Sequence, residues 1–168
     1  APLISLKPVI YCANVAEDPA HNAEVARLGE HAAERGAKVA TVSAKMEEEL
    51  LGVTEDERRE FLESFGIAEN GLDAVIRAGY ETLDLVSFFT TNEKEAHAWE
   101  VVRGTHAPQA AGKIHTDFEQ GFIRAEVIGW EDFVKLGGEA HCRAAGVTRT
   151  EGKDYVVQDG DVILFRFH

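Results

Sequence analysis

The hydrophobic positions near the start of the chain predict a strand–helix–strand unit. Val9–Ala13 is a continuous apolar run, which is typical of a strand buried on both faces. Apolar residues then recur at helical spacing from Val25 to Ala32, and Gly36 is suited to end that helix. A second apolar run at 39–42 completes a βαβ unit with parallel strands. Two strands cannot bury both faces of a sheet, so we expect the rest of the sheet to lie outside this chain.

The segment that follows is predicted to be helical. Thr54 and Glu57 stand at the spacing of a capping box, which indicates that a helix begins after Thr54. Asn70 is suited to cap a further helix. The apolar stripe of that helix runs from Leu72 to Leu83 and has the clearest helical periodicity in the chain.

From residue 85 the pattern predicts a compact α+β domain. The segments with regular patterns are strands at 87–91 and 98–102, a helix at 108–114, a strand at 122–128, helical turns at 130–136 and 139–145, and strands at 155–157 and 162–167. The last two strands are expected to pair as a hairpin, because Asp159-Gly160 suits a type I′ turn. The strands at 87–91 and 98–102 are expected to pair as a hairpin around 92–95. Two hairpins that flank a helix favour a β-grasp domain. The predicted fold class is therefore α/β for residues 1–84, followed by α+β for residues 85–168.

Charge and composition narrow the classes of partner. The 168 residues include 17 basic and 30 acidic side chains, and the net charge of −13 divides into −9 for residues 1–84 and −4 for residues 85–168. Such an acidic surface disfavours duplex DNA, although the less acidic half leaves room for a local basic patch. Cys12 is expected to be a buried apolar residue, and neither it nor Cys142 belongs to a metal-binding pair. With no apolar run of about 18 residues and no leader pattern, we expect no membrane segment and a cytoplasmic location.

Polar motifs follow both strands of the predicted βαβ unit. Asn14-Val15-Ala16-Glu17 comes directly after the first strand, and Ser43-Ala44-Lys45 follows the second. Because ligands collect beyond the carboxyl ends of parallel strands, both motifs are expected at one site. An asparagine amide suits the N6/N7 edge of adenine, and backbone N–H groups of the second motif could meet another edge of a purine. The structural alternative is that Asn14 only ends a strand and Ser43 only caps a helix.

Other patterns give no support for a complete catalytic centre. The histidines lack the i,i+3 or i,i+4 partners of a helical zinc site, and Asp159-Gly160-Asp161 is not a calcium loop. No G-x-x-x-x-G-K-[ST] phosphate loop occurs. The chain alone is therefore not expected to hold a triphosphate.

The sequence resembles the YchF/Obg-like ATPases, P-loop proteins of the GTPase superfamily. In the first half the resemblance lies in Lys7–Tyr11, Asn14–Glu17 and Ser43–Lys45. At Asn14–Glu17 this family carries N-x-x-E, whereas guanine-specific relatives carry N-K-x-D. In the second half it lies in Phe88–Thr90, Ala98-Trp99, Gly104–Phe118, Gly121–Val127 and Asp154–Asp161, which resemble the TGS domain of that family. Essentially the whole chain is covered.

The resemblance implies a division of roles along the chain. Residues 1–84 would be the C-terminal part of a P-loop nucleotide-binding domain, and residues 85–168 a ubiquitin-like TGS domain. The implied nucleotide is ATP, with its Mg²⁺ and phosphates held by residues that precede this segment, so the chain alone is expected to be inactive. By position, Asn14 and Val15 would contact adenine, Glu17 would replace the aspartate that binds guanine, and Ser43 and Ala44 would close the other edge of the base.

The resemblance also implies association with the ribosome or with structured RNA. Lys113, His115 and Arg124 lie in the most similar segment and are the candidate RNA-facing residues. Two alternatives remain open. The chain could be a nucleotide-independent RNA- or ribosome-binding module that acts through the TGS domain, or a small enzyme that uses His115 and Asp117.

Overall fold

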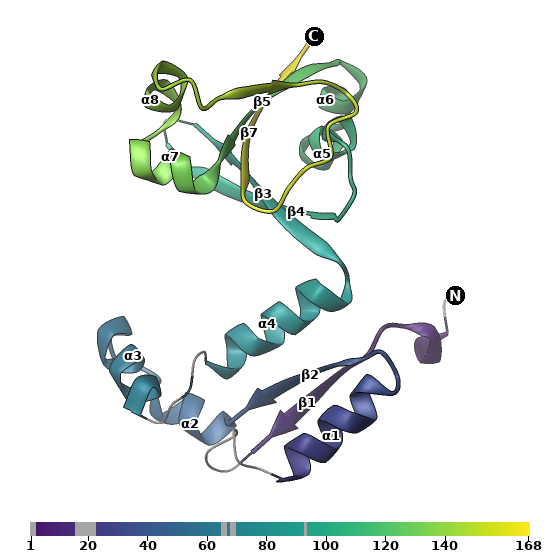
Figure 1. The fold of residues 1–168 in the computed structure, drawn as a ribbon, viewed down its shortest axis with the longest axis vertical. Coiled ribbons are helices and arrows are strands. Elements are labelled where there is room, and N and C mark those ends of the chain that lie inside the picture. The colour runs from purple at the N-terminus through teal and green to yellow at the C-terminus, as the bar shows by residue number, and fades with distance from the viewer. Residues whose placement is uncertain (1–2, 16–22, 65–66, 68–69, 93) are drawn as a thin grey trace. The chain divides into compact units, whose positions relative to one another are not determined.

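The computed structural model describes residues 3–15, 23–64, 67, 70–92 and 94–168. The chain divides into two compact units, residues 1–83 and 84–168 (Figure 1). The first unit contains a 3-10 turn at Ile4–Leu6, β1 (Ile10–Asn14), α1 (Ala23–Ala33), β2 (Lys38–Val42), α2 (Ala44–Glu49), α3 (Glu55–Ser64) and α4 (Gly71–Thr82). Among the described residues, no helix combines the length and apolar character needed to cross a membrane.

The strand pair of the first unit is parallel, which confirms the predicted βαβ arrangement. Ile10 lies opposite Lys38, and the register continues to Asn14 opposite Val42. Both capping predictions for this unit are also confirmed. The Thr54 N–H and hydroxyl each donate to the Glu57 carboxylate at 2.8 Å, and the Asn70 side chain accepts from the backbone N–H of Asp73 at 2.8 Å.

Helices α1 and α4 cover opposite faces of this strand pair (Figure 1). The Tyr11 ring meets the His31 ring of α1 with centroids 5.6 Å apart. Lys38 pairs with Glu81 of α4 at 2.8 Å. Lys38 is the register partner of Ile10, and Tyr11 is the next residue along β1. Because side chains alternate along a strand, Tyr11 and Lys38 lie on different faces of the strand pair.

The expectation that Cys12 is buried is wrong. Cys12 is exposed, although it shares its face with Ala40, its register partner, which is 2% exposed beneath α4. The difference follows from the position of α4, which packs mainly over β2, so that Gly71 sits against the Val42 side chain. Among the described residues no strand pairs with the other edge of β1, and Cys12 therefore lacks a neighbour there.

The second unit is a five-stranded mixed sheet with helices on both faces. Its elements are β3 (Leu85–Thr91), β4 (Ala96–Val102), α5 (Ala107–Ile114), α6 (Thr116–Gln120), β5 (Phe122–Gly129), α7 (Trp130–Leu136), α8 (Glu139–Ala144), β6 (Arg149–Glu151) and β7 (Asp161–Phe167). The strand order is β4-β3-β7-β5-β6. Strand β7 runs parallel to β3, and the other neighbouring strands are antiparallel.

The core lies between one face of this sheet and α5. Ala107, Ala110 and Ala111 are fully buried, and their small side chains let α5 approach the strands closely. Their main sheet partners are Val86, Phe88, Val101, Ala125, Val127, Ile163 and Phe165. A smaller cluster on the opposite face packs α7 and α8 over Ile128 and Val162.

The predicted hairpin of residues 155–157 with 162–167 is wrong. Val156 forms only an isolated antiparallel bridge to His106, whereas β7 lies in the centre of the sheet between β3 and β5. The turn itself exists, since the Asp161 N–H donates to the Gln158 carbonyl at 3.2 Å. It is not type I′: Gly160 has φ +83°, but among the described residues Asp84 is the only non-glycine with positive φ, which excludes Asp159.

Candidate functional site

The two polar motifs of the first unit meet at the carboxyl edge of its strand pair. Asn14 ends β1 opposite Val42, and the Asn14 Oδ1 accepts a hydrogen bond from the Ala44 N–H at 3.1 Å. The parallel arrangement predicts this meeting, because it brings both strand ends to one edge.

The neighbours of these two residues are held by their local structure. Val15 is 8% exposed, and its N–H donates to the Val42 carbonyl at 2.8 Å. Ser43 is 5% exposed, and its hydroxyl accepts from the Met46 N–H at 3.4 Å as the N-cap of α2. Glu17, the remaining predicted residue of this edge, lies outside the described residues.

The chemistry of this edge is that of an exposed asparagine amide. Because Oδ1 of Asn14 is bound to Ala44, the side-chain NH₂ is the group available to donate to a ring acceptor, and Oδ1 keeps a second lone pair. This donor–acceptor pair suits a purine edge such as N6/N7 of adenine. The Ala44 N–H positions Asn14, so in this structure it is not the free donor that the sequence suggested.

The predicted RNA-facing residues of the second unit do not form one patch. Lys113 lies on α5 and faces Glu100 at 3.9 Å, whereas Arg124 lies on β5 and contacts Glu126 at 3.3 Å. Ala125 is fully buried in the core beneath α5, so strand alternation directs Arg124 to the opposite side of the sheet.

His115 serves as a helix cap in this structure. Its Nδ1 accepts from the Asp117 N–H at 3.1 Å and so caps α6. The Asp117 carboxylate is 3.5 Å from the same nitrogen. Because Nδ1 accepts this N–H, it carries no proton to donate to the Asp117 carboxylate, so the aspartate does not orient the imidazole as it would in a histidine–aspartate catalytic pair.

Sequence reasoning missed the two arginines that share the Glu126 carboxylate with Arg124. Arg143 on α8 and Arg166 on β7 both contact Glu126, whose pKa is lowered, chiefly by the hydrogen bond from Arg166. Strand alternation could have paired Arg124 with Glu126. Only the register of β5 with β7 reveals Arg166, and only the packing of α8 reveals Arg143.

A second network that sequence reasoning missed surrounds Asp161, which is 3% exposed. Its carboxylate accepts from the Tyr155 hydroxyl at 2.7 Å and from the Gln158 N–H at 2.9 Å, and Arg149 lies 3.4 Å away. Burial, reinforced by the Asp161 carboxylate, raises the pKa of Tyr155 to about 12. The network fixes the segment that leads into β7.

Comparison with known proteins places the chain in a family. Residues 85–168 match the family model YchF-GTPase_C, described as a protein of unknown function (DUF933). The chain is 49% identical to the ribosome-binding ATPase YchF of Bacillus subtilis over 99% of its own length, and 52% identical to that of Haemophilus influenzae over 98%. It also resembles the solved structure of the Schizosaccharomyces pombe YchF GTPase, with 36% identity and a TM-score of 0.79 over 95% of the chain and 43% of that structure.

These similarities define a mixed α/β chain of the kind found in YchF GTPase structures. The chain belongs to the YchF family. It spans about 46% of the length of the curated bacterial relatives that it matches.

Proposed function

We propose that this chain supplies the base-binding edge and a ribosome-contacting domain to a YchF-type ATPase of the cytoplasm. In this proposal residues 1–84 belong to the P-loop nucleotide-binding domain, and Asn14, Val15, Glu17, Ser43 and Ala44 surround the adenine. The observation that carries it is the hydrogen bond between Asn14 and Ala44, which joins two motifs from separate strands at the edge where α/β sheets bind ligands. The relatives are named ribosome-binding ATPases, which supports the proposed use of ATP and contact with the ribosome.

Phosphate and Mg²⁺ binding would come from other parts of the protein. The sequence has no phosphate loop, and the described residues include no group of His, Cys, Asp or Glu placed to hold a metal. Much of the affinity for ATP comes from phosphate-loop N–H groups, the loop lysine and Mg²⁺. The 168-residue chain should therefore neither hydrolyse ATP nor bind it with submicromolar affinity in calorimetry.

The role of Asn14 can be tested in the protein that carries this chain together with a phosphate loop. Asn14→Asp keeps an oxygen that can accept from the Ala44 N–H but removes the NH₂ donor, whereas Asn14→Ala removes both. If the amide reads adenine, both variants should weaken ATP binding by about 1–3 kcal/mol. If Asn14 has only a structural role, Asn14→Asp should bind ATP as the wild type does.

Glu17 provides the second arm of this test. Glu17→Asp shortens the side chain by one methylene and restores the aspartate that binds guanine in related proteins. It should therefore raise the affinity for GTP relative to ATP. Fluorescent-nucleotide titrations of both nucleotides would measure the ratio. A ratio that none of these variants changes would refute the assignment of this edge to base recognition.

Residues 85–168 are proposed to be a TGS domain that contacts ribosomal or other structured RNA. A mixed sheet with its last strand beside its first, and one helix packed on the core face, supports a β-grasp assignment. Lys113, His115 and Arg124 remain the residues proposed for RNA. Co-sedimentation of the chain with ribosomes tests this proposal, and it also separates the alternative of a nucleotide-independent module, since that module would pellet equally with and without ATP in the complete protein.

A further inference from the structure

Three arginines of the second unit converge on a single carboxylate. We call Arg124, Arg143 and Arg166, together with Glu126, the arginine cluster. Arg166 binds Glu126 in a bidentate manner, with Nε and Nη2 each 3.2 Å from a carboxylate oxygen. Arg143 reaches the same carboxylate at 3.0 Å and Arg124 at 3.3 Å.

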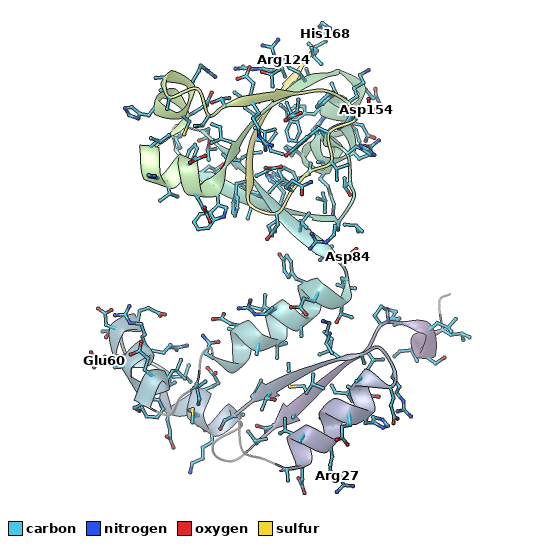
Figure 2. The ribbon with its side chains drawn as sticks, viewed as in Figure 1. Arg27, Glu60, Asp84, Arg124, Asp154 and His168 are labelled. Atoms are coloured by element: carbon cyan, nitrogen blue, oxygen red, sulfur yellow. The ribbon has the colours of Figure 1, made fainter. Side chains whose placement is uncertain are left out.

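The cluster lies on the sheet face opposite α5. Arg124 and Arg166 are register partners on adjacent strands, and Glu126 is two residues from Arg124 on the same face. Arg143 joins them from α8, on the face that α7 and α8 cover. Three separate segments of the chain thus bring guanidinium groups to the Glu126 carboxylate. Figure 2 labels Arg124, the member of the cluster that lies on β5.

The exposure of these side chains shows that the cluster is more than an internal ion pair. The Glu126 side chain is 12% exposed, whereas those of Arg124, Arg143 and Arg166 are 51%, 55% and 44% exposed. The carboxylate is therefore the buried member of the cluster, whereas the arginine side chains are exposed and carry N–H groups beyond those that bind Glu126. Glu139, which binds Arg143, is the second acidic partner, so the cluster keeps a positive excess within a chain of net charge −13.

We propose that the arginine cluster binds phosphodiester groups of the RNA backbone. This inference rests on the proposed ribosome and RNA association and names a surface for it that includes Arg124 but neither Lys113 nor His115. Guanidinium groups match phosphate oxygens with paired N–H donors, and holding them in place reduces the entropy lost on binding. Neighbouring strands lie about 4.8 Å apart, which lets Arg124 and Arg166 engage the same phosphate or adjacent ones.

The test compares two variants of the full 168-residue chain. Arg124→Gln with Glu126→Gln and Arg166→Gln removes two arginines together with the carboxylate that they bind, so no buried charge is left without a partner. Lys94→Gln with Lys153→Gln is the control, because it removes more net positive charge from exposed positions elsewhere in the unit. Tryptophan fluorescence checks that both fold.

The binding probes are purified ribosomes and a fluorescein-labelled RNA hairpin, each titrated over a salt series. The triple variant should bind the hairpin about tenfold more weakly. The slope of the logarithm of its affinity against the logarithm of the salt concentration should fall by the equivalent of about two phosphate contacts. The control should stay within about twofold of the wild type. Arg143→Gln, which leaves the bidentate pair of Arg166 with Glu126 in place, should weaken binding severalfold and keeps the test decisive if the triple variant does not fold.

The outcomes separate this inference from the proposal on which it rests. If the wild-type chain binds neither ribosomes nor RNA, the proposed association fails and the cluster assignment fails with it. If the wild type binds and the cluster variants bind equally well, only the cluster assignment is overturned. It is also overturned if the variants bind polyglutamate more weakly than the wild type does but bind RNA equally well, since the surface would then recognise an acidic protein segment.

Discussion

Removal of the Tyr155 hydroxyl is a direct test of the Asp161 network. In Tyr155→Phe the ring is retained, so the change deletes the 2.7 Å hydrogen bond to Asp161 and the 3.1 Å contact with Arg149 without opening a large cavity. Asp161 is almost fully buried, and its carboxylate needs its donors to offset the loss of water. The variant should therefore destabilise residues 84–168.

The size of the effect follows from what remains around the carboxylate. A hydrogen bond to a charged group contributes about 1.5–3 kcal/mol. The Gln158 N–H at 2.9 Å and Arg149 at 3.4 Å still serve Asp161 after the substitution. We therefore expect the lower end of this range, about 1.5 kcal/mol.

Urea unfolding, monitored by tryptophan fluorescence, measures this loss of stability in residues 84–168, the unit that contains Tyr155. The chain has two tryptophans, and both, Trp99 and Trp130, lie in residues 84–168. A loss of about 1.5 kcal/mol lowers the urea midpoint by about 1 M for a domain of this size. Tyr80→Phe makes the same substitution in the other unit and should leave the midpoint unchanged.

A double-mutant cycle decides whether the hydroxyl acts through Asp161. Tyr155→Phe, Asp161→Asn and their combination should show a coupling free energy of about 1 kcal/mol or more, because the pair is in direct contact. Additive effects, or a Tyr155→Phe midpoint equal to that of the wild type, would refute the role of this network in stability.

Two further predictions concern the same region. The pKa of Tyr155 is raised from its ordinary value of 10 to about 12 in the folded chain, so the folded state binds this proton more tightly than the unfolded state does. This stabilisation is complete below pH 10 and is lost as pH rises toward 12. The gap in unfolding free energy between wild type and Tyr155→Phe should therefore narrow over that interval, and a constant gap would contradict the shift. Gly160→Ala should destabilise the unit more than Gly104→Ala does: both glycines have positive φ, +83° and +89°, but a Cβ at 160 would collide with the Trp130 ring, whereas one at 104 meets open space. Gly104→Ala should cost about 1–2 kcal/mol from backbone strain alone, and equal losses in urea unfolding would show that Trp130 moves aside freely.

Local signals in the sequence were sufficient for features that local contacts create. The Thr54–Glu57 box and the Asn70 cap each join residues three positions apart, and both form as predicted. The hairpin of β3 with β4 also forms as predicted, with Asn92 accepting from the N–H groups of Lys94 and Glu95 across its turn. In each case the partners are close along the chain, so residue type and spacing decide the structure.

The turn at Asp159-Gly160 shows where such signals stop. Its residues predict a turn, and a turn forms, but they do not determine which strand pairs with β7. Asp159 accepts from the Ser87 N–H at 2.8 Å, and Gly160 donates to the Ser87 carbonyl at 2.8 Å. The turn therefore packs against β3, far away along the chain, and directs β7 into the centre of the sheet.

The two candidate sites differ in how far the sequence could predict them. Asn14 and Ala44 are also far apart in sequence, yet the rule that parallel strands share a carboxyl edge places them together, and the hydrogen bond agrees. No comparable rule links Lys113 with Arg124. Their membership of one similar segment suggests a shared surface, but the strand turns Arg124 away from α5 and toward Arg166, its register partner. A basic surface on a sheet is defined by register and by the face of each strand, so Arg124 is better grouped with Arg143 and Arg166 than with its neighbours in sequence.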